Sequence, residues 1–167
     1  MSTKWCSLVP ESILLIGAGG HCRSIIDIIE NTNFFQVQGV IDHQDSKSTE
    51  VSNYPIVGKD DDLALFSSKI KYAFPAVGFL KCQSNRAKLF FKIQEADFSI
   101  PNIISQRSYI SPHAKMKNGN AVMHDVVINI NCKIGFNNIM QTKSILEHDV
   151  VVGNHNYIST SAVINGG

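Results

Sequence analysis

An imidazole stands between two carboxylates in Glu147-His148-Asp149. An imidazole titrates near neutral pH, so it can take a proton from a nucleophile. A neighbouring carboxylate can orient the ring and stabilise the imidazolium that results. We expect Asp149 to do this for His148, with Glu147 as the substitute. A histidine between two acids is also common in solvated surface clusters, so the triplet by itself leaves both interpretations open.

A second candidate for chemistry is the glycine-rich run at residues 17–21, Gly-Ala-Gly-Gly-His. It follows a short apolar run, residues 12–16, and precedes a helical pattern. Glycines at such a turn let the backbone approach a ligand, and the first amides of the helix can donate to an anion such as a phosphate. The run therefore predicts nucleotide binding, with the alternative that its glycines only close a tight turn.

Asp42 follows the next apolar run, residues 37–41, where an acidic residue can bind a ribose hydroxyl. The full dinucleotide fingerprint, however, has a third glycine at the position that Cys22 occupies here. NAD binding is therefore the weaker interpretation. It predicts that the chain binds NADH and that Asp42→Ala weakens this binding.

Strand and helix patterns alternate over the part of the chain that must position these groups. The predicted strands cover residues 12–16, 37–41 and 72–77, and the predicted helices cover residues 22–30, 63–66 and 85–95. Residues 55–58 resemble a loop, and the acidic residues after it are expected to cap the short helix that follows. Gly78 closes the third strand. Together these elements predict a small parallel α/β domain over residues 1–97.

An apolar side chain recurs at every sixth position of the following segment. The series is Ile104, Ile110, Met116, Val122, Ile128, Ile134, Met140, Leu146, Val152, Ile158 and Ile164. This period fits neither an amphipathic helix nor strand alternation, and it is typical of a solenoid whose short strands each turn one side chain inward. We expect Gly135 and Gly153, which follow their aliphatic residues, to need positive φ. Residues 98–167 are therefore predicted to form a β-helix.

The composition is that of an ordinary soluble globular protein, 44% hydrophobic and 17% charged with a net charge of +1. Lysines and arginines are spread along the chain, so no basic patch indicates nucleic acid or an anionic membrane. The cysteines show no metal-binding spacing, and no apolar run approaches the roughly 20 residues of a membrane span. We expect a cytoplasmic protein without a metal, a nucleic acid partner or a membrane partner.

Residues 15–21, at the start of a short α/β domain that precedes hexapeptide repeats, resemble those of a group of bacterial sugar acyltransferases. The group comprises sialic acid O-acetyltransferases and UDP-bacillosamine N-acetyltransferases, and the resemblance covers essentially the whole chain. It implies a Rossmann-like domain over residues 1–97 that holds a nucleotide-linked sugar, followed by a left-handed parallel β-helix over residues 98–167. The hand comes from the resemblance, because left-handed parallel crossovers are rare. The implied reaction is acetyl transfer from acetyl-CoA to a nucleotide-linked amino sugar or a sialic-acid-like sugar.

The resemblance also implies roles for particular residues. The positions that hold the nucleotide sugar are, in this chain, Gly19, Gly20, His21, Asp42 and Gly78. His148 corresponds to the general base that takes a proton from the acceptor sugar, and Asp149 to a flanking acid. Tyr157 stands where some members place a second histidine near the cofactor. The family reaction uses no metal.

The chain departs from the family pattern at several positions. His43 follows Asp42 where the family often has a second aspartate, and Gln141 stands where some members have an asparagine. The repeat stops at residue 167, whereas relatives continue for several coils that carry much of the acetyl-CoA site. We therefore expect a C-terminally shortened, incomplete β-helix in a homotrimer whose catalytic histidine faces a neighbouring subunit. The alternative is a catalytically inactive nucleotide-sugar-binding module that lacks the C-terminal CoA-binding coils.

Overall fold

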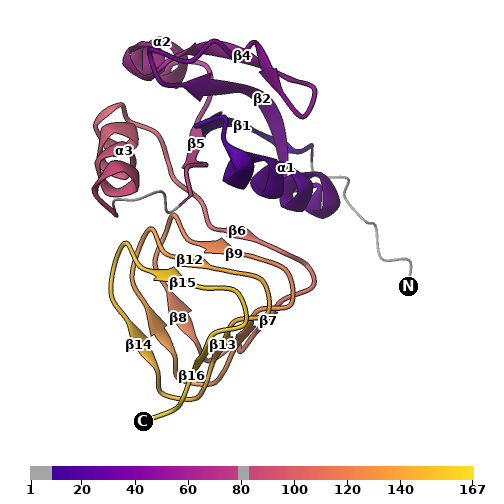
Figure 1. Ribbon diagram of the computed structural model, residues 1–167, viewed down its shortest axis with the longest axis vertical. Helices are drawn as coiled ribbons and strands as arrows, with labels where there is room; N and C mark the ends of the chain where they lie inside the picture. Colours follow the sequence, from indigo (N-terminus) through magenta and orange to yellow (C-terminus); the bar gives the residue numbers. More distant parts are fainter. Residues whose placement is uncertain (1–8, 79–82) are drawn as a thin grey trace, which may run out of the picture.

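Two architectures are stacked along the long axis of the computed structural model, which describes residues 9–78 and 83–167 (Figure 1). An α/β layer forms the upper part of the figure and a three-sided parallel β-helix the lower part. The C-terminus lies on the side of the β-helix that faces away from the α/β layer. Within the described ranges, no helix has both the length and the apolar character needed to cross a membrane.

The α/β layer is built on a five-stranded sheet of order β3-β4-β2-β1-β5. Its elements are β1 (Glu11–Ile16), α1 (Gly20–Thr32), β2 (Phe35–Asp42), β3 (Glu50–Val51), β4 (Tyr54–Lys59), the 3₁₀ helix η1 (Asp60–Asp62), α2 (Leu63–Ser67), β5 (Tyr72–Pro75) and α3 (Gln83–Glu95). β1 pairs in parallel with β2 and β5, and β2 pairs in parallel with β4. Residues 13–16 of β1 are fully buried, as expected for a strand with both faces covered.

The predicted strands and helices of this layer are all present within a few residues of their expected bounds. Residues 55–58 are where the prediction is wrong, because they lie in β4 and not in a loop. Pro55 argues against a central strand, since proline has no N–H to donate to a ladder. It is tolerated here because β4 is next to the two-residue edge strand β3, which runs antiparallel to it. The sheet is therefore mixed and not purely parallel.

Each predicted six-residue repeat of the β-helix contains one two-residue strand. These strands are β6 (Ile103–Ile104), β7 (Tyr109–Ile110), β8 (Lys115–Met116), β9 (Ala121–Val122), β10 (Val127–Ile128), β11 (Lys133–Ile134), β12 (Ile139–Met140), β13 (Ile145–Leu146), β14 (Val151–Val152), β15 (Tyr157–Ile158) and β16 (Val163–Ile164). They form three parallel sheets, β7-β10-β13-β16, β8-β11-β14 and β6-β9-β12-β15. Ile128 pairs with Ile110 and Leu146, so three hexapeptides make one coil. The predicted solenoid is confirmed.

Asparagine side chains are stacked along one corner of the β-helix, at Asn102, Asn120, Asn138 and Asn156. The side-chain oxygen of each of the first three accepts a 2.8 Å hydrogen bond from the backbone N–H of the asparagine in the next coil. The same oxygen accepts a second bond from that residue's side-chain amide. Asn120 and Asn138 are fully buried, so the ladder satisfies polar groups that would otherwise be costly.

A left-handed backbone position also recurs every six residues along the β-helix. It is occupied by Asp125, Asn131, Asn137, Lys143, Asp149, His155 and Ser161, with φ between 57° and 66°. The expectation of positive φ at Gly135 and Gly153 is therefore wrong. Gly135 is needed for a different reason, because a Cβ there would lie 2.4 Å from the carbonyl oxygen of Gly153 in the next coil. The close stacking of coils requires this glycine, and a left-handed backbone conformation does not.

The α/β layer packs on the β6-β9-β12-β15 sheet, with α1 against β6 (Figure 1). Ile103, Ala121 and Ile139, the outward-facing residues of three of these strands, are buried beneath it. His124 of the β-helix also contacts the α/β layer, because its Nε2 lies 2.9 Å from Asp27 Oδ2 of α1. The β-helix thereby fixes the position of the glycine turn.

Candidate active site

A cavity of about 650 Å³ opens at the carboxyl ends of β1 and β2. Ligands of open α/β sheets bind at this edge. The cavity is lined by all the residues predicted to hold the nucleotide sugar, which are Gly19, Gly20, His21, Asp42 and Gly78. Gln141 and Tyr157 of the β-helix line it too, so both architectures contribute to one site.

The glycines of the turn serve two different purposes. Gly17 has φ of +103°, and a Cβ there would lie 2.5 Å from Val77 Cγ2, so the fold itself requires this glycine. At Gly19 and Gly20 a Cβ would meet no atom within 4 Å. These two glycines leave open space on the side of the cavity, as a turn that lets a ligand approach the backbone must do.

The N-terminus of α1 points its first amides at this cavity, since Gly20 and His21 line it. No side chain caps the helix at Gly19, and its first turn contains no acidic residue. The leading amides of a helix have no partner within the helix, and the helix dipole is positive at this end. The site therefore suits an anionic group such as a phosphate.

The ring of His21 is enclosed by the cavity wall, where Gly78 packs against it. Burial, with a smaller contribution from the charge of Arg86, lowers the pKa of His21 to about 3. The ring is therefore neutral at physiological pH. Its Nε2 atom is buried and has no hydrogen-bond partner within the described residues. A buried ring nitrogen without a partner is uncommon, and this one belongs to a residue that lines the cavity.

Asp42 is buried at the end of β2, and its Oδ1 accepts a 3.2 Å hydrogen bond from the backbone N–H of Ala18. The carboxylate therefore holds the glycine turn as well as lining the cavity. His43, the departure from the family pattern, accepts a hydrogen bond at Nδ1 from the Asp45 backbone. Both residues also line a second cavity of about 440 Å³, together with Lys88 and Lys92 of α3.

The predicted catalytic pair lies on the corner between β13 and β14. His148 Nδ1 is 2.8 Å from Asp149 Oδ2, and this hydrogen bond, helped by one from Asn131, lowers the pKa of Asp149. Glu147, the substitute, instead accepts a 2.8 Å hydrogen bond from Asn129 Nδ2. The geometry thus favours Asp149 over Glu147 as the group that orients the ring.

His148 lies apart from the cavity of its own chain, on a corner of the β-helix that does not border it. A Cβ at Gly166 would be 2.7 Å from His148 Cε1, so the histidine is next to the C-terminal residues. In Figure 1 the C-terminus lies at the lower edge of the β-helix, on the side away from the α/β layer. His148 is not among the residues that line the cavity, and its side chain is 60% exposed.

Known proteins match both the α/β layer and the β-helix of this chain. Residues 12–93 match the family model described as the PglD N-terminal domain. A mutant of perosamine N-acetyltransferase from Caulobacter crescentus, in complex with CoA and GDP-perosamine, superposes with a TM-score of 0.86. Its sequence identity is 27%, over 93% of this chain and 72% of that one. Residues 12–93 are therefore of the PglD N-terminal type, and the chain is similar over most of its length to a solved sugar N-acetyltransferase.

Two further solved structures are similar. PerB from Caulobacter crescentus, in complex with CoA and GDP-perosamine, has a TM-score of 0.79 and 28% identity over 87% of this chain and 67% of that one. The acetyltransferase domain of PglB from Neisseria gonorrhoeae FA1090, in complex with acetyl coenzyme A, has a TM-score of 0.84. At 22% identity, over 94% of this chain and 74% of that one, the latter supports the fold alone. These proteins share the predicted fold class, an α/β domain followed by a left-handed hexapeptide β-helix.

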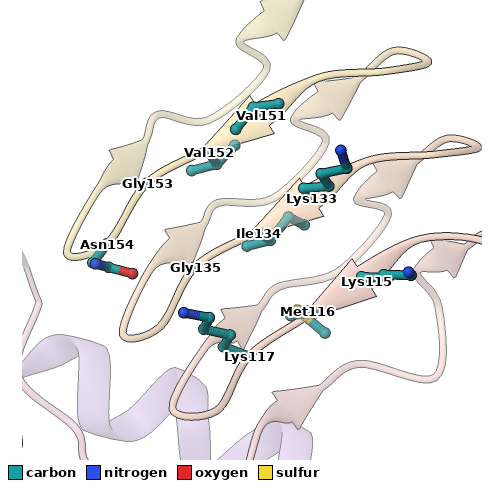
Figure 2. Close-up of a pocket in the computed structure, with 10 residues that line it drawn as sticks. All are labelled: Lys115, Met116, Lys117, Lys133, Ile134, Gly135, Val151, Val152, Gly153 and Asn154. Atoms are coloured by element: carbon teal, nitrogen blue, oxygen red, sulfur yellow. The ribbon is translucent and has the colours of Figure 1, made fainter.

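One outer face of the β-helix forms a shallow groove of about 370 Å³ on the β8-β11-β14 sheet. Figure 2 shows Lys115, Lys133 and Val151 in line on successive strands of that face. They are in line because the register joins residues one coil apart. The hexapeptide pattern predicts that residues one coil apart are stacked, but it identifies only the inward-facing residues. This basic outer face was therefore not predicted from the sequence.

Ser24, Ser46 and Ser48 also line the cavity at the glycine turn and were not predicted. Ser46 and Ser48 belong to the polar loop after β2, and loops at the carboxyl edge of a parallel sheet commonly carry binding residues. Their position after Asp42 was therefore a usable signal. Ser24 lies within α1, where nothing in the sequence distinguishes it from a solvated helical serine.

Proposed function

We propose that this PglD-type chain transfers an acetyl group from acetyl-CoA to the amino group of a nucleotide-linked sugar. One observation carries the proposal: the glycine turn, the α1 N-terminus, His21 and Asp42 meet in one cavity that the β-helix completes with Tyr157. Solved structures of its similar proteins contain CoA together with GDP-perosamine. The sialic-acid-like acceptor and O-acetylation are the other outcomes within the same reaction class.

The nucleotide diphosphate would lie against the amides of Gly20 and His21, where a helix N-terminus favours negative charge. The unpartnered Nε2 of His21 would hydrogen-bond the ligand. Asp42 would accept a hydrogen bond from a ribose hydroxyl. Tyr157 lies on the β-helix side of the same cavity and would contact the bound acetyl-CoA.

His148 is the proposed general base. Its Nε2 takes a proton from the sugar amine as the amine nitrogen attacks the thioester carbonyl carbon. A backbone amide would stabilise the tetrahedral oxyanion. When the intermediate collapses, the carbon–sulfur bond breaks, and the proton on His148 passes to the leaving CoA sulfur. Asp149, bonded to Nδ1, holds the ring and stabilises the imidazolium while it exists.

His148 is exposed and does not line the cavity of its own chain, which supports a site formed between subunits. The outward residues of the β7-β10-β13-β16 sheet are apolar, and Tyr109 and Val163 are 56% and 55% exposed. Ile130, one coil below His148, is 47% exposed. Apolar side chains gathered beside a candidate base are typical of a surface that a partner covers. We propose a homotrimer in which His148 of one chain serves the cavity of the next.

A reducing compartment such as the cytoplasm is part of the proposal. Cys22 and Cys132 are free thiols in the described structure, and both are buried. Burial raises the pKa of Cys22 to about 12, which leaves its thiol unreactive. Cys6 and Cys82 lie outside the described residues.

The experiment measures acetyl-CoA consumption and the mass of the acetylated product with UDP- and GDP-linked amino sugars. Wild type is expected to turn over, His148→Ala to lose turnover, and His113→Ala to retain it, since His113 is another exposed histidine of the β-helix. Equal rates for wild type and His148→Ala would reject His148 as the base. Calorimetric binding of UDP or GDP without binding of acetyl-CoA would favour the catalytically inactive binding module.

A further inference from the structure

A buried arginine, Arg86 of α3, lies behind the wall of the nucleotide-sugar cavity with 5% of its surface exposed. Its guanidinium donates to the backbone carbonyl oxygens of Pro75 and Val77, the latter at 2.8 Å. The same group reaches the carbonyl oxygen of Gly119 in the β-helix at 3.4 Å. Its carbon Cζ lies 5.4 Å from the centroid of the Phe74 ring.

Among the residues that the structure describes, the charge of Arg86 has no acidic partner. The ion pairs of residues 9–78 and 83–167 are Lys92–Asp61, Arg107–Asp125, His124–Asp27 and His148–Asp149. Its Nε atom is buried without a hydrogen-bond partner in the same part of the chain. Burying a cation against neutral carbonyls costs stability, and an apolar side chain of similar volume would fill the space at lower cost. The charge therefore indicates a use other than packing.

The cavity is the adjacent site that would benefit from this charge. Val77 and Gly78 both line it, and Gly78 packs against His21. Burial and the charge of Arg86 keep His21 neutral, because they lower its pKa to about 3. Burial also lowers the pKa of Arg86 itself to about 9, which leaves the guanidinium protonated at neutral pH. The wall around His21 is thus positively charged through Arg86 and not through the histidine.

The hydrogen bond to Val77 also sets the direction of a peptide group. In a trans peptide the C=O and the following N–H point in opposite directions. Because the Val77 oxygen points to Arg86, the N–H of Gly78 points away from Arg86, and Gly78 lines the cavity. The arginine therefore combines a charge with an oriented backbone donor at the same wall.

We propose that Arg86 is a positioning residue for the diphosphate of the nucleotide sugar: its buried charge attracts the phosphates, and its bond to Val77 turns the Gly78 N–H toward them. This rests on the proposed nucleotide-sugar function. A charge in a low-dielectric wall acts more strongly on an anion than one in water does. The role differs from a purely structural clamp, which would affect every ligand of the cavity alike.

The test compares a nucleoside diphosphate with its nucleoside, using UDP against uridine and GDP against guanosine in calorimetric titrations. The quantity of interest is the ratio of the two dissociation constants, which measures what the diphosphate adds. Arg86→Met and Arg86→Gln remove the charge, and Gln keeps an N–H donor. Arg86→Lys keeps the charge without the planar fork. Arg107→Met is the control, since it removes an arginine charge from an exposed ion pair on the β-helix.

The neutral variants are expected to lower the diphosphate advantage at least about tenfold, with nucleoside binding changed less than about twofold. Arg86→Lys is expected to restore most of the advantage, and Arg107→Met to leave it unchanged. Equal losses for nucleoside and diphosphate, or no loss of either, would overturn the proposal. So would failure of both neutral variants to fold, which would assign Arg86 a structural role. If wild type binds neither UDP nor GDP, the proposed function itself fails.

Discussion

The Nδ1 atom of His148 lies 2.8 Å from the Oδ2 atom of Asp149, the next residue in the chain. Two neighbours in sequence can meet in this way at a corner of the β-helix where Asp149 has a left-handed backbone with φ of 66°. A carboxylate at Nδ1 leaves Nε2 as the atom that can take a proton. The proposed catalytic pair is therefore formed by two adjacent residues, whereas the cavity that it is proposed to serve is lined by other parts of the chain.

Asp149→Asn is expected to lower kcat by about 10- to 100-fold, because a partner that orients a reacting histidine is typically worth that much. The KM for the nucleotide sugar should change little, since Asp149 does not line the cavity. Steady-state kinetics measure both constants. Glu147→Gln is the matched control, and its effect should stay below about threefold because Glu147 bonds Asn129 instead. Equal losses in the two variants would mean that neither acid has a specific role.

The low pKa of His21 predicts a pH dependence of stability. The folded chain holds this ring neutral down to a pKa of about 3, whereas an ordinary histidine has a pKa of 6.5. Between these values the unfolded chain binds the additional proton, so stability is fully present above pH 6.5 and falls as the pH is lowered. His21 should contribute a loss of about 2 kcal/mol at pH 5.

Urea titrations of the unliganded protein at neutral and acid pH measure this loss. His21→Gln should lose correspondingly less stability on acidification than wild type. His113→Gln, which replaces an exposed histidine, should behave as wild type does. Parallel losses in wild type and His21→Gln would show that His21 is not buried as a neutral ring.

The glycine turn offers a pair of substitutions with opposite outcomes. Gly19→Ala should change the free energy of unfolding by less than about 0.5 kcal/mol, since its Cβ would meet no atom within 4 Å. It should weaken UDP or GDP binding, because the methyl group enters the space of the ligand. Gly17→Ala should cost about 1 to 3 kcal/mol through its positive φ and the contact with Val77. Unimpaired nucleotide binding by Gly19→Ala would argue that no ligand approaches this turn.

The period of six made the β-helix predictable, because stacking one coil on the next requires the same inward residue at each corner. Ile128, Met140 and Leu146 are fully buried for this reason. The local turn chemistry was less predictable. Gly135 suggested positive φ, but that conformation falls on Asn131 and Asn137 instead, since asparagine tolerates it. A glycine in a sequence does not reveal whether it is required for a left-handed backbone conformation or for close packing.

The glycine turn and Asp42 were predictable as parts of one site because strand ends of a parallel sheet meet at one edge. The location of Tyr157 in the same cavity depends on how the α/β layer packs on the β-helix, which no local pattern records. Arg86 shows the same limit. An arginine in a helix is normally exposed, and only the packed structure reveals that this one is buried without an acid.

The most direct test of a site shared between chains is complementation between two inactive variants. His148→Ala lacks the base but keeps the cavity, and His21→Ala has an altered cavity but keeps the base. The two are co-expressed with different affinity tags and purified through both, so that each trimer contains chains of both kinds. Pairing His148→Ala with the double variant that carries both substitutions is the control and should remain inactive.

The measurement is acetyl-CoA turnover by the doubly purified trimers. In a cyclic trimer of two chains of one kind and one of the other, one of the three interfaces joins an intact cavity to an intact His148. The account therefore predicts about a third of the wild-type rate. Mixed trimers as inactive as either parent would contradict it, because the base and the cavity would then have to act within a single chain.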